Sequence, residues 1–141
     1  MAYSPQIQRL MRRLDGIPDA IKRDLQPAVV KSAYEVAHLQ RRLAESSRDT
    51  GALIDSIEVT GPGETTPAYS QPGGSHTAHE VQALVTVGNS EVRYPHLVEY
   101  GTKDAPAQPF FWPAVRSLQK RINNRLNRAA RKAIRDFWSN Q

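Results

Sequence analysis

Hydrophobic residues recur every three or four positions over residues 18–47, and this spacing predicts a long amphipathic helix. The recurring positions are Ile21, Leu25, Val29, Ser32, Val36, Leu39 and Leu43. Pro18 suits the first turn of this helix. Pro27 is expected to kink the helix or to mark its true start, because an internal proline removes a backbone donor and crowds the preceding turn. A shorter helix is expected over residues 5–14.

The same spacing returns near the C-terminal end and predicts a second long helix, from about Trp112 and Pro113 towards Phe137. Its apolar positions are Val115, Leu118, Ile122, Leu126, Ala129, Ala133 and Phe137. Residues 94–100 favour a short helix that Gly101 ends. Residues 105–111 are expected to be extended, because a residue that precedes proline avoids the helical region.

Two segments between these helices are typical of strands. Apolar and polar residues alternate over residues 80–87, and residues 57–60 form a second short run before a Gly-Pro-Gly turn. Because two strands alone are marginally stable, a third strand or a neighbouring subunit is expected to complete the sheet. The sequence therefore predicts one α+β domain over residues 1–141, with a small antiparallel sheet packed against a long N-terminal-half helix and a long C-terminal helix.

Residues 61–79 contain four glycines and three prolines, which predicts a long flexible loop. A loop of this length inside a compact domain is usually functional or is ordered by a partner.

Charge is distributed unevenly along the chain. The net charge is +3 over residues 1–47, −5 over residues 48–111 and +7 over residues 112–141. A basic helix beside an acidic middle allows attraction between copies of the chain, and it also allows contact with nucleic acid. A solvated helix face is the simpler alternative.

Candidate catalytic and metal-binding residues are sparse. The chain has no cysteine, which excludes disulfides and thiolate chemistry. His76 and His79 are three residues apart, but a zinc site needs three or four converging ligands, so a polar loop is favoured. Neither a nucleophile elbow nor a phosphate-binding loop occurs, and Glu99 alone makes no acid–base pair. We therefore expect no enzyme activity, no cofactor and no metal. No apolar run approaches a membrane span, and no secretory signal is expected.

Two motifs point to a family. The first is Arg-Asp-Thr-Gly-Ala-Leu-Ile-Asp-Ser-Ile at residues 48–57, and the second is Tyr-Pro-His-Leu-Val-Glu-Tyr-Gly-Thr at residues 94–102, followed by Pro-Ala-Gln-Pro-Phe-Phe-Trp-Pro-Ala at residues 106–114. In this order and spacing they resemble the small neck or tail-component proteins, which include tail-completion and head–tail joining proteins, of long-tailed double-stranded-DNA bacteriophages. The motif residues are Thr50, Gly51, Leu53, Ser56, Ile57, Val98, Glu99, Tyr100, Gly101, Thr102, Pro106, Pro109, Phe110 and Pro113.

These motif residues have structural interpretations rather than catalytic ones. Thr50 and Gly51 would end the first long helix and reverse the chain. Leu53 and Ile57 would seat the next segment on the core. Glu99 would meet backbone donors. The prolines would stiffen an extended crossing that delivers the aromatic residues at positions 110–112 as anchors.

The resemblance implies a structural virion protein that forms a ring at the head–tail junction, assembled in the host cytoplasm. A hexamer is the natural expectation and a dodecamer is the alternative. The ring would join the head connector or head-completion protein to the tail tube or tail terminator, without a membrane, and genomic DNA would pass through it without sequence readout. The candidate oligomer or DNA-lumen contacts are Arg121, Arg125, Arg128, Arg131, Lys132 and Arg135. The alternative function is a free nucleic-acid-binding protein that uses this basic helix.

Overall fold

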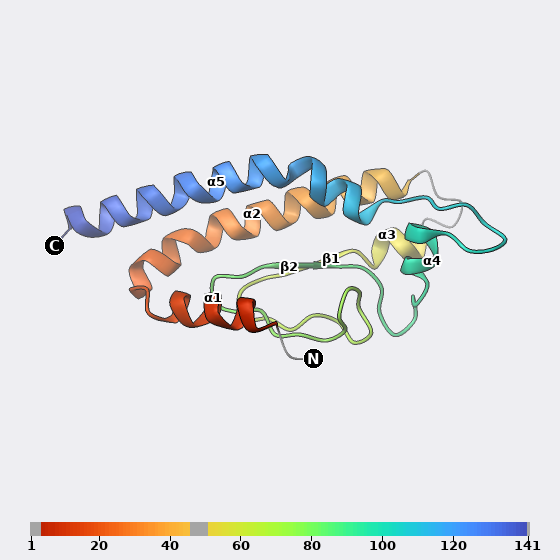
Figure 1. Cartoon of the computed structure of the whole chain (residues 1–141), viewed down its shortest axis with the longest axis horizontal. Coiled ribbons are helices and arrows are strands. Elements are labelled where there is room, and N and C mark those ends of the chain that lie inside the picture. Colours follow the sequence, from red (N-terminus) through yellow and green to blue (C-terminus); the bar gives the residue numbers. More distant parts are fainter. Residues whose placement is uncertain (1–3, 46–50, 141) are drawn as a thin grey trace.

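Two long antiparallel helices form one layer of the molecule, and a small sheet with its loops forms the other (Figure 1). The computed structural model describes residues 4–45 and 51–140. In chain order the elements are α1 (Pro5–Asp15), α2 (Asp19–Ala44), α3 (Gly51–Asp55), β1 (Glu58–Thr60), β2 (Leu84–Thr86), α4 (Pro95–Tyr100) and α5 (Phe111–Ser139). The α+β class and the two long helices are confirmed.

Helix α2 runs without interruption through Pro27. The expectation that Pro27 marks the true start of the helix is therefore wrong. Pro18 instead precedes the first turn at the N-cap position, with φ of −54°. A proline ring fixes φ near this value, which is compatible with entry into a helix. The packing of α2 along α5 supports the helix on both sides of Pro27, so tertiary contacts outweigh the local cost of proline.

An ionic cluster joins the middles of α2 and α5. The Arg125 guanidinium donates to the Ser32 hydroxyl at 3.1 Å and to the Glu35 carboxylate at 2.6 Å. Arg121 reaches the other oxygen of Glu35 at 3.2 Å. Only 13% of the Arg125 side chain is exposed, so this contact lies largely out of water and holds the two helices in register.

The hydrophobic core lies where the C-terminal half of α2, the helix α3, the sheet and the start of α5 meet. Its buried members are Ala37, Ala44, Leu53, Ile57, Val87, Val92, Phe110 and Phe111. Along the rest of the α2–α5 seam most of the expected apolar positions are half-buried, although Ile21, Ser32, Val36 and Ala133 are buried. The core is therefore concentrated at one end of the helix pair.

The sheet is shorter than the alternation predicts. Strands β1 and β2 pair antiparallel with Val59 opposite Val85, and β2 covers only three of the eight expected residues. The backbone before β2 bonds elsewhere: the Glu80 carbonyl accepts from the Gln26 side chain at 2.7 Å, and the Val81 N–H donates to the His79 ring at 3.3 Å. These side chains therefore bond the backbone carbonyl and N–H groups that a longer β2 would use to pair with a neighbouring strand.

The expected third strand is absent from the part of the chain that the structure describes. A single bridge stands in its place, in which Gln71 and Val87 exchange backbone hydrogen bonds of 2.8 and 3.0 Å. The segment 61–79 folds back on itself in a similar way, since Thr65 pairs with Thr77 and the Thr66 N–H donates to the His76 carbonyl at 2.7 Å. One bridge from this segment thus extends the small sheet, and the other closes the segment on itself.

Helix α4 ends at Gly101, as expected, in a conformation that suits glycine alone. Gly101 has φ of 77° and ψ of 173°, a region that residues with a side chain almost never adopt. A Cβ atom here would lie 2.6 Å from the Ala107 backbone nitrogen. Gly101 therefore permits the close crossing of residues 101–110 over the end of α4.

Replacing Gly101 with alanine is expected to destabilise the fold. The strained backbone costs about 1–3 kcal/mol, and the clash with backbone atoms adds to this cost. Chemical denaturation of Gly101→Ala measures the loss, with Gly51→Ala as the matched control, because nothing lies within 4 Å of an added Cβ at Gly51. Equal stability of the two variants would contradict this account of Gly101.

Candidate functional site

The two sequence motifs meet in space at the junction of α3, α4 and α5. Leu53 and Ile57 of the first motif and Phe110 of the second belong to the same buried cluster, and Val98 packs against it half-buried. Thr50 lies outside the described residues. Gly51 is the first residue of α3 and α2 already ends at Ala44, so the expectation that Gly51 ends the first long helix is wrong. The motifs therefore build one structural centre from segments about 50 residues apart.

Ser56 links the first motif to the end of β2. Its buried hydroxyl donates to the Leu53 carbonyl at 2.7 Å and accepts from the Gly88 N–H at 3.0 Å. Gly88 has φ of 91°, and an added Cβ would lie 2.8 Å from the Val92 carbonyl oxygen. The Ser56 hydroxyl thus fixes the tight turn that leads from the sheet to α4.

We expect Ser56→Ala to destabilise the chain by about 1–3 kcal/mol, because the buried Gly88 N–H loses its acceptor. The control is Ser117→Ala, whose hydroxyl bonds only its own helix at an exposed position. Denaturant titration of both variants is the measurement. A Ser56→Ala variant as stable as the control would show that the hydrogen bond between Gly88 and Ser56 contributes nothing to stability.

Glu99 caps the long helix α5 from the neighbouring helix. Its Oε1 accepts from the Phe110 and Phe111 N–H groups at 2.8 and 2.9 Å, and its Oε2 accepts from the Trp112 N–H at 3.2 Å. No side chain of α5 itself caps this end. Pro113, in the same first turn, has no N–H to satisfy. The expectation that Glu99 meets backbone donors is confirmed, and the residue is fully committed to this role.

The remaining motif residues shape the crossing between α4 and α5. The exposed Tyr100 hydroxyl accepts from the Trp112 indole N–H at 3.0 Å. The Thr102 hydroxyl accepts from the Asp104 and Ala105 N–H groups at 3.3 and 3.1 Å, which closes a turn. Pro106 and Pro109 are exposed on this extended segment.

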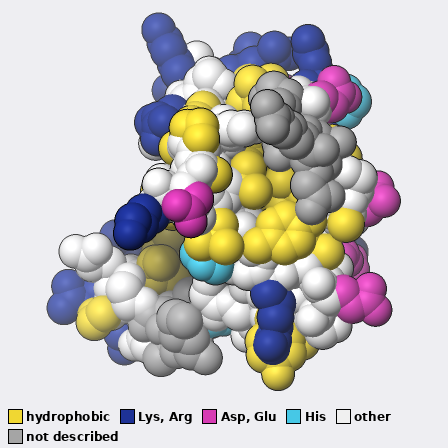
Figure 2. Space-filling view, turned by 90° about the vertical axis from the view of Figure 1, so that its right-hand side faces the viewer, with side chains coloured by type: hydrophobic (Ala, Val, Ile, Leu, Met, Phe, Trp, Pro, Cys, Tyr) yellow, Lys and Arg dark blue, Asp and Glu magenta, His cyan; other side chains and the backbone are white. Residues whose placement is uncertain are grey.

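An apolar hollow of about 170 Å³ opens at this junction, at the end of the molecule opposite the C-terminus. Figure 2 shows this end face, with hydrophobic side chains at its centre and charged side chains of both signs around them. The hollow is lined by Gln71, Pro72, Val87, Pro95, His96, Glu99, Tyr100, Phe110, Phe111 and Trp112. Its one carboxylate is occupied as the helix cap, so the hollow offers apolar contact rather than acid–base chemistry.

The basic residues of α5 do not all face outwards. Arg125 is turned towards α2 and bonds Ser32 and Glu35, so its guanidinium is held within the chain. Arg121 also pairs with Glu35, although most of its side chain is exposed. Arg135 lies 3.9 Å from Asp136. Arg128, Arg131 and Lys132 are exposed. Arg116 and Lys120, nearer the start of the helix, are exposed as well, so exposed basic residues occur along most of α5.

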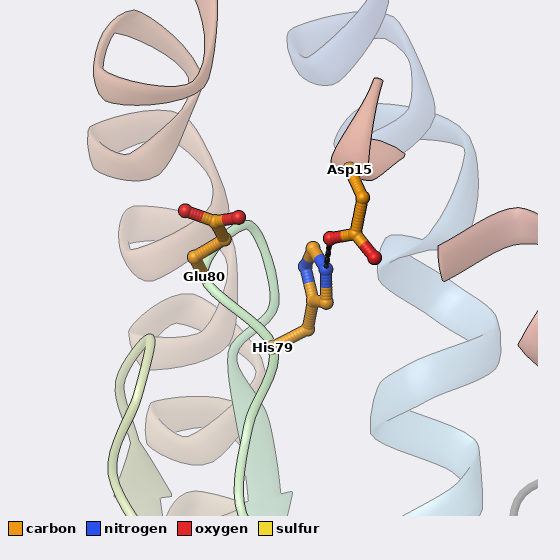
Figure 3. Close-up of side chains that lie close together, drawn as sticks. All are labelled: Asp15, His79 and Glu80. Atoms are coloured by element: carbon orange, nitrogen blue, oxygen red, sulfur yellow. Dashed lines mark hydrogen bonds and ion pairs between the residues drawn. The ribbon is translucent and has the colours of Figure 1, made fainter. Parts of the chain in front are cut away.

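Three potential metal ligands lie close together where the end of α1 meets the segment that precedes β2. Ligand atoms of Asp15, His79 and Glu80 lie within 4.8 Å of one another (Figure 3). The His79 Nε2 is 2.7 Å from Asp15, and its Nδ1 accepts from the Val81 N–H. Both ring nitrogens are thus already bonded. The candidate His76 is not part of this group.

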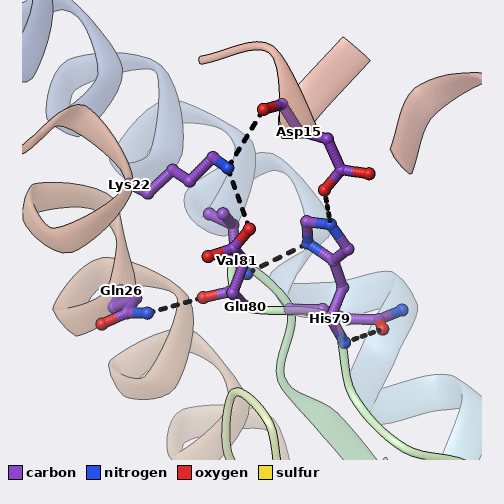
Figure 4. A network of polar contacts seen from close by, with 7 residues as sticks. Asp15, Lys22, Gln26, His79, Glu80 and Val81 are labelled. Carbon is purple, nitrogen blue, oxygen red and sulfur yellow. Dashed lines mark hydrogen bonds and ion pairs between the residues drawn. The ribbon is translucent and has the colours of Figure 1, made fainter. Parts of the chain in front are cut away.

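A lysine provides the positive charge in this group. The Lys22 ammonium donates to Glu80 at 2.8 Å and to the Asp15 carbonyl at 3.3 Å (Figure 4). The hydrogen bond to Glu80 raises the pKa of Lys22 above its ordinary value, although burial opposes the rise. Since the folded pKa is the higher one, this contact contributes fully at neutral pH and is lost only as the pH rises into the alkaline range. The cluster thus connects the end of α1 and the start of α2 to the segment that precedes β2.

Sequence reasoning missed this cluster and the apolar hollow. Both bring together residues that are far apart in the sequence: Lys22 bonds Glu80, and Pro72 and Trp112 line the same hollow. No periodic pattern in the sequence indicates that either pair of residues lies close together.

Comparison with known proteins identifies a family for the chain. Residues 8–101 match the family described as "Bacteriophage HK97-gp10, putative tail-component". No curated protein and no solved structure matches the chain. Within the described residues, every helix is too short or too polar to cross a bilayer. Because the match covers two thirds of the sequence, the chain belongs to the HK97-gp10-like family of bacteriophage tail components.

Proposed function

We propose that this chain is a structural subunit that forms a closed ring at the phage head–tail junction, as a neck or tail-completion protein. The ring would join the capsid connector to the tail tube and would let DNA pass. The observation that carries the proposal is the family match over residues 8–101. The motif residues support it, because Ser56 and Glu99 serve packing and helix capping rather than chemistry.

The ring is proposed as a hexamer, with a dodecamer as the alternative, built from the single domain 1–141. Its partners are the head-completion or connector protein on one side and the tail tube or tail terminator on the other. Assembly in the host cytoplasm and incorporation into the virion follow from this role. The loop at 61–79, predicted to be flexible, is proposed to become ordered against a partner.

DNA would meet the ring through exposed basic residues of α5. Arg128, Arg131 and Lys132 are among them, and residues 112–141 carry a net charge of +7. Contacts of this kind attract phosphates without reading sequence. We include Arg121 and Arg135 as secondary contacts and Arg125 only if assembly releases it from Glu35.

The same surface favours the second candidate function, a free nucleic-acid-binding protein. That function requires salt-sensitive DNA binding by the isolated monomer, whereas a ring subunit needs none. Fluorescence anisotropy with a short duplex at rising salt concentration separates the two. Tight binding that Arg128→Gln and Lys132→Gln together abolish would favour the second function.

Deletion of the gene tests the proposed function in the phage. We expect DNA-filled heads and complete tails that fail to join, and a plasmid copy of the gene should restore joined particles. Joined, infectious particles without this chain would refute the proposal.

A further inference from the structure

We infer that the apolar hollow at the α4–α5 junction receives the aromatic C-terminal turn of α5 from a second copy of this chain. The inference rests on the proposed function, since it specifies how neighbouring subunits of the ring touch. The hollow of one copy forms one side of the contact, and Phe137 and Trp138 of the other copy form the other side.

The C-terminal turn of α5 carries unpartnered aromatic surface. Trp138 is 69% exposed, and its ring packs edge-to-face against Phe137 with centroids 5.6 Å apart. Ile134, one turn earlier, is 46% exposed. A large aromatic side chain is usually well buried on average, and aromatic residues are enriched at protein interfaces. In Figure 1 this end of α5 projects past the start of α2.

The hollow suits one aromatic ring in size and lining. Its volume is about 170 Å³, and it is walled by Phe110, Phe111 and Trp112 with prolines beside them. A cavity of about 150 Å³ in a protein core takes up benzene. The Tyr100 and Trp112 side chains at its rim are themselves exposed by 69% and 37%, so this end face is an apolar surface open to a partner.

The C-terminal turn of α5 cannot reach the hollow of its own chain. Helix α5 begins at the hollow, with Phe111 and Trp112 in its wall, and reaches Trp138 near its last turn. A straight helix of this length separates the two ends by roughly 40 Å. An aromatic C-terminal turn in the hollow must therefore come from another copy, and the contact joins two different surfaces of identical chains. Contacts of this type build rings when the rotation between neighbours closes.

Charge favours the same pairing. The one carboxylate in the lining of the hollow is that of Glu99, and every lining residue except Trp112 comes from residues 48–111, which carry a net charge of −5, whereas the C-terminal part of α5 belongs to the segment with +7. Arg131 and Arg135 precede Trp138 by two turns and one turn, respectively, and are exposed. Complementary charge of this kind guides the approach and orientation of the two surfaces.

Disulfide trapping tests the contact. Because the sequence contains no cysteine, only the introduced thiols can form disulfides. His96→Cys places a thiol on the exposed rim of the hollow, and Ser139→Cys places one beside Trp138 without removing it. Under mild oxidation the full-length double variant is expected to give a ladder of linked chains. A mixture of the two single variants should link into dimers and nothing larger.

Two matched variants make the result specific. Adding Trp138→Ala to the double variant should lower the yield of linked chains by roughly tenfold or more, as loss of an interface anchor does. The pair Leu10→Cys with Ser139→Cys places a thiol on another exposed apolar side chain, on α1, and should give no ladder. A ladder no stronger than that of this control, or one that Trp138→Ala leaves unchanged, overturns the inference.

The outcome is separable from that of the proposed function. A ring present in particles whose His96→Cys, Ser139→Cys subunits do not link overturns the docking and leaves the function standing. Linked chains in solution, with the protein absent from particles, support the docking and refute the function.

Discussion

Glu99→Ala is expected to lower the free energy of unfolding by roughly 3–5 kcal/mol, because three backbone N–H groups at the start of α5 lose a charged acceptor at once. Two of these donors, on Phe110 and Phe111, belong to buried residues that water does not reach easily. The carboxylate also lies at the positive end of the helix dipole, so its removal costs electrostatic stabilisation as well. A domain of this kind has a total stability of about 5–15 kcal/mol, so the loss is a large fraction of it.

Two companion variants show whether the cap is the cause. Glu99→Gln keeps the shape and one acceptor oxygen but loses the charge, so an intermediate loss of about 1–3 kcal/mol is expected. Glu91→Ala removes an exposed carboxylate nearby in sequence and should change stability by less than about 0.5 kcal/mol. Urea denaturation followed by circular dichroism provides all three values. A Glu99→Ala variant that behaves like Glu91→Ala would remove the capping role.

Phe110→Ala is expected to be equally damaging, with a loss of about 3–5 kcal/mol, because it empties a fully buried site. The Phe110 ring is 0% exposed and packs edge-to-face against Phe111, with centroids 6.5 Å apart. It is the largest of the fully buried side chains, and it lies where the two motifs and α5 meet.

The matched control for Phe110 is Tyr34→Ala, which removes an aromatic ring that is 56% exposed on α2 and should change stability by no more than about 1 kcal/mol. Phe110→Leu keeps most of the apolar volume and should fall between the two. Denaturation midpoints rank the three variants. If Phe110→Ala proved as mild as Tyr34→Ala, the junction would not be the main core of the fold.

The elements with strong local signals could be predicted from the sequence. The periodicity of residues 18–47 and 112–137 predicted α2 and α5, because an apolar stripe at helical spacing needs no knowledge of its partner. Gly101 predicted the end of α4, because few other residues adopt its backbone conformation. The role of Glu99 could be anticipated from its place in the motif, although its three donors lie more than ten residues away.

Features that depend on distant side chains could not be predicted. The length of β2 is set by His79 and by Gln26, the latter more than 50 residues away. Arg125 was grouped with the outward basic residues because a charge on a helix carries no sign of its direction. Ser32 and Glu35, about 90 residues earlier, turn it inwards. The hollow is likewise assembled from four separate segments.

The most direct test of the proposed ring is cryo-electron microscopy of intact particles made with this gene in its native context. The account predicts density for this chain as a closed ring between the head connector and the tail tube, with α5 recognisable as a single helix of 29 residues. Six copies around the axis would give the hexamer, and twelve would give the alternative. Particles that are complete but contain no density for this chain at the junction would contradict the account.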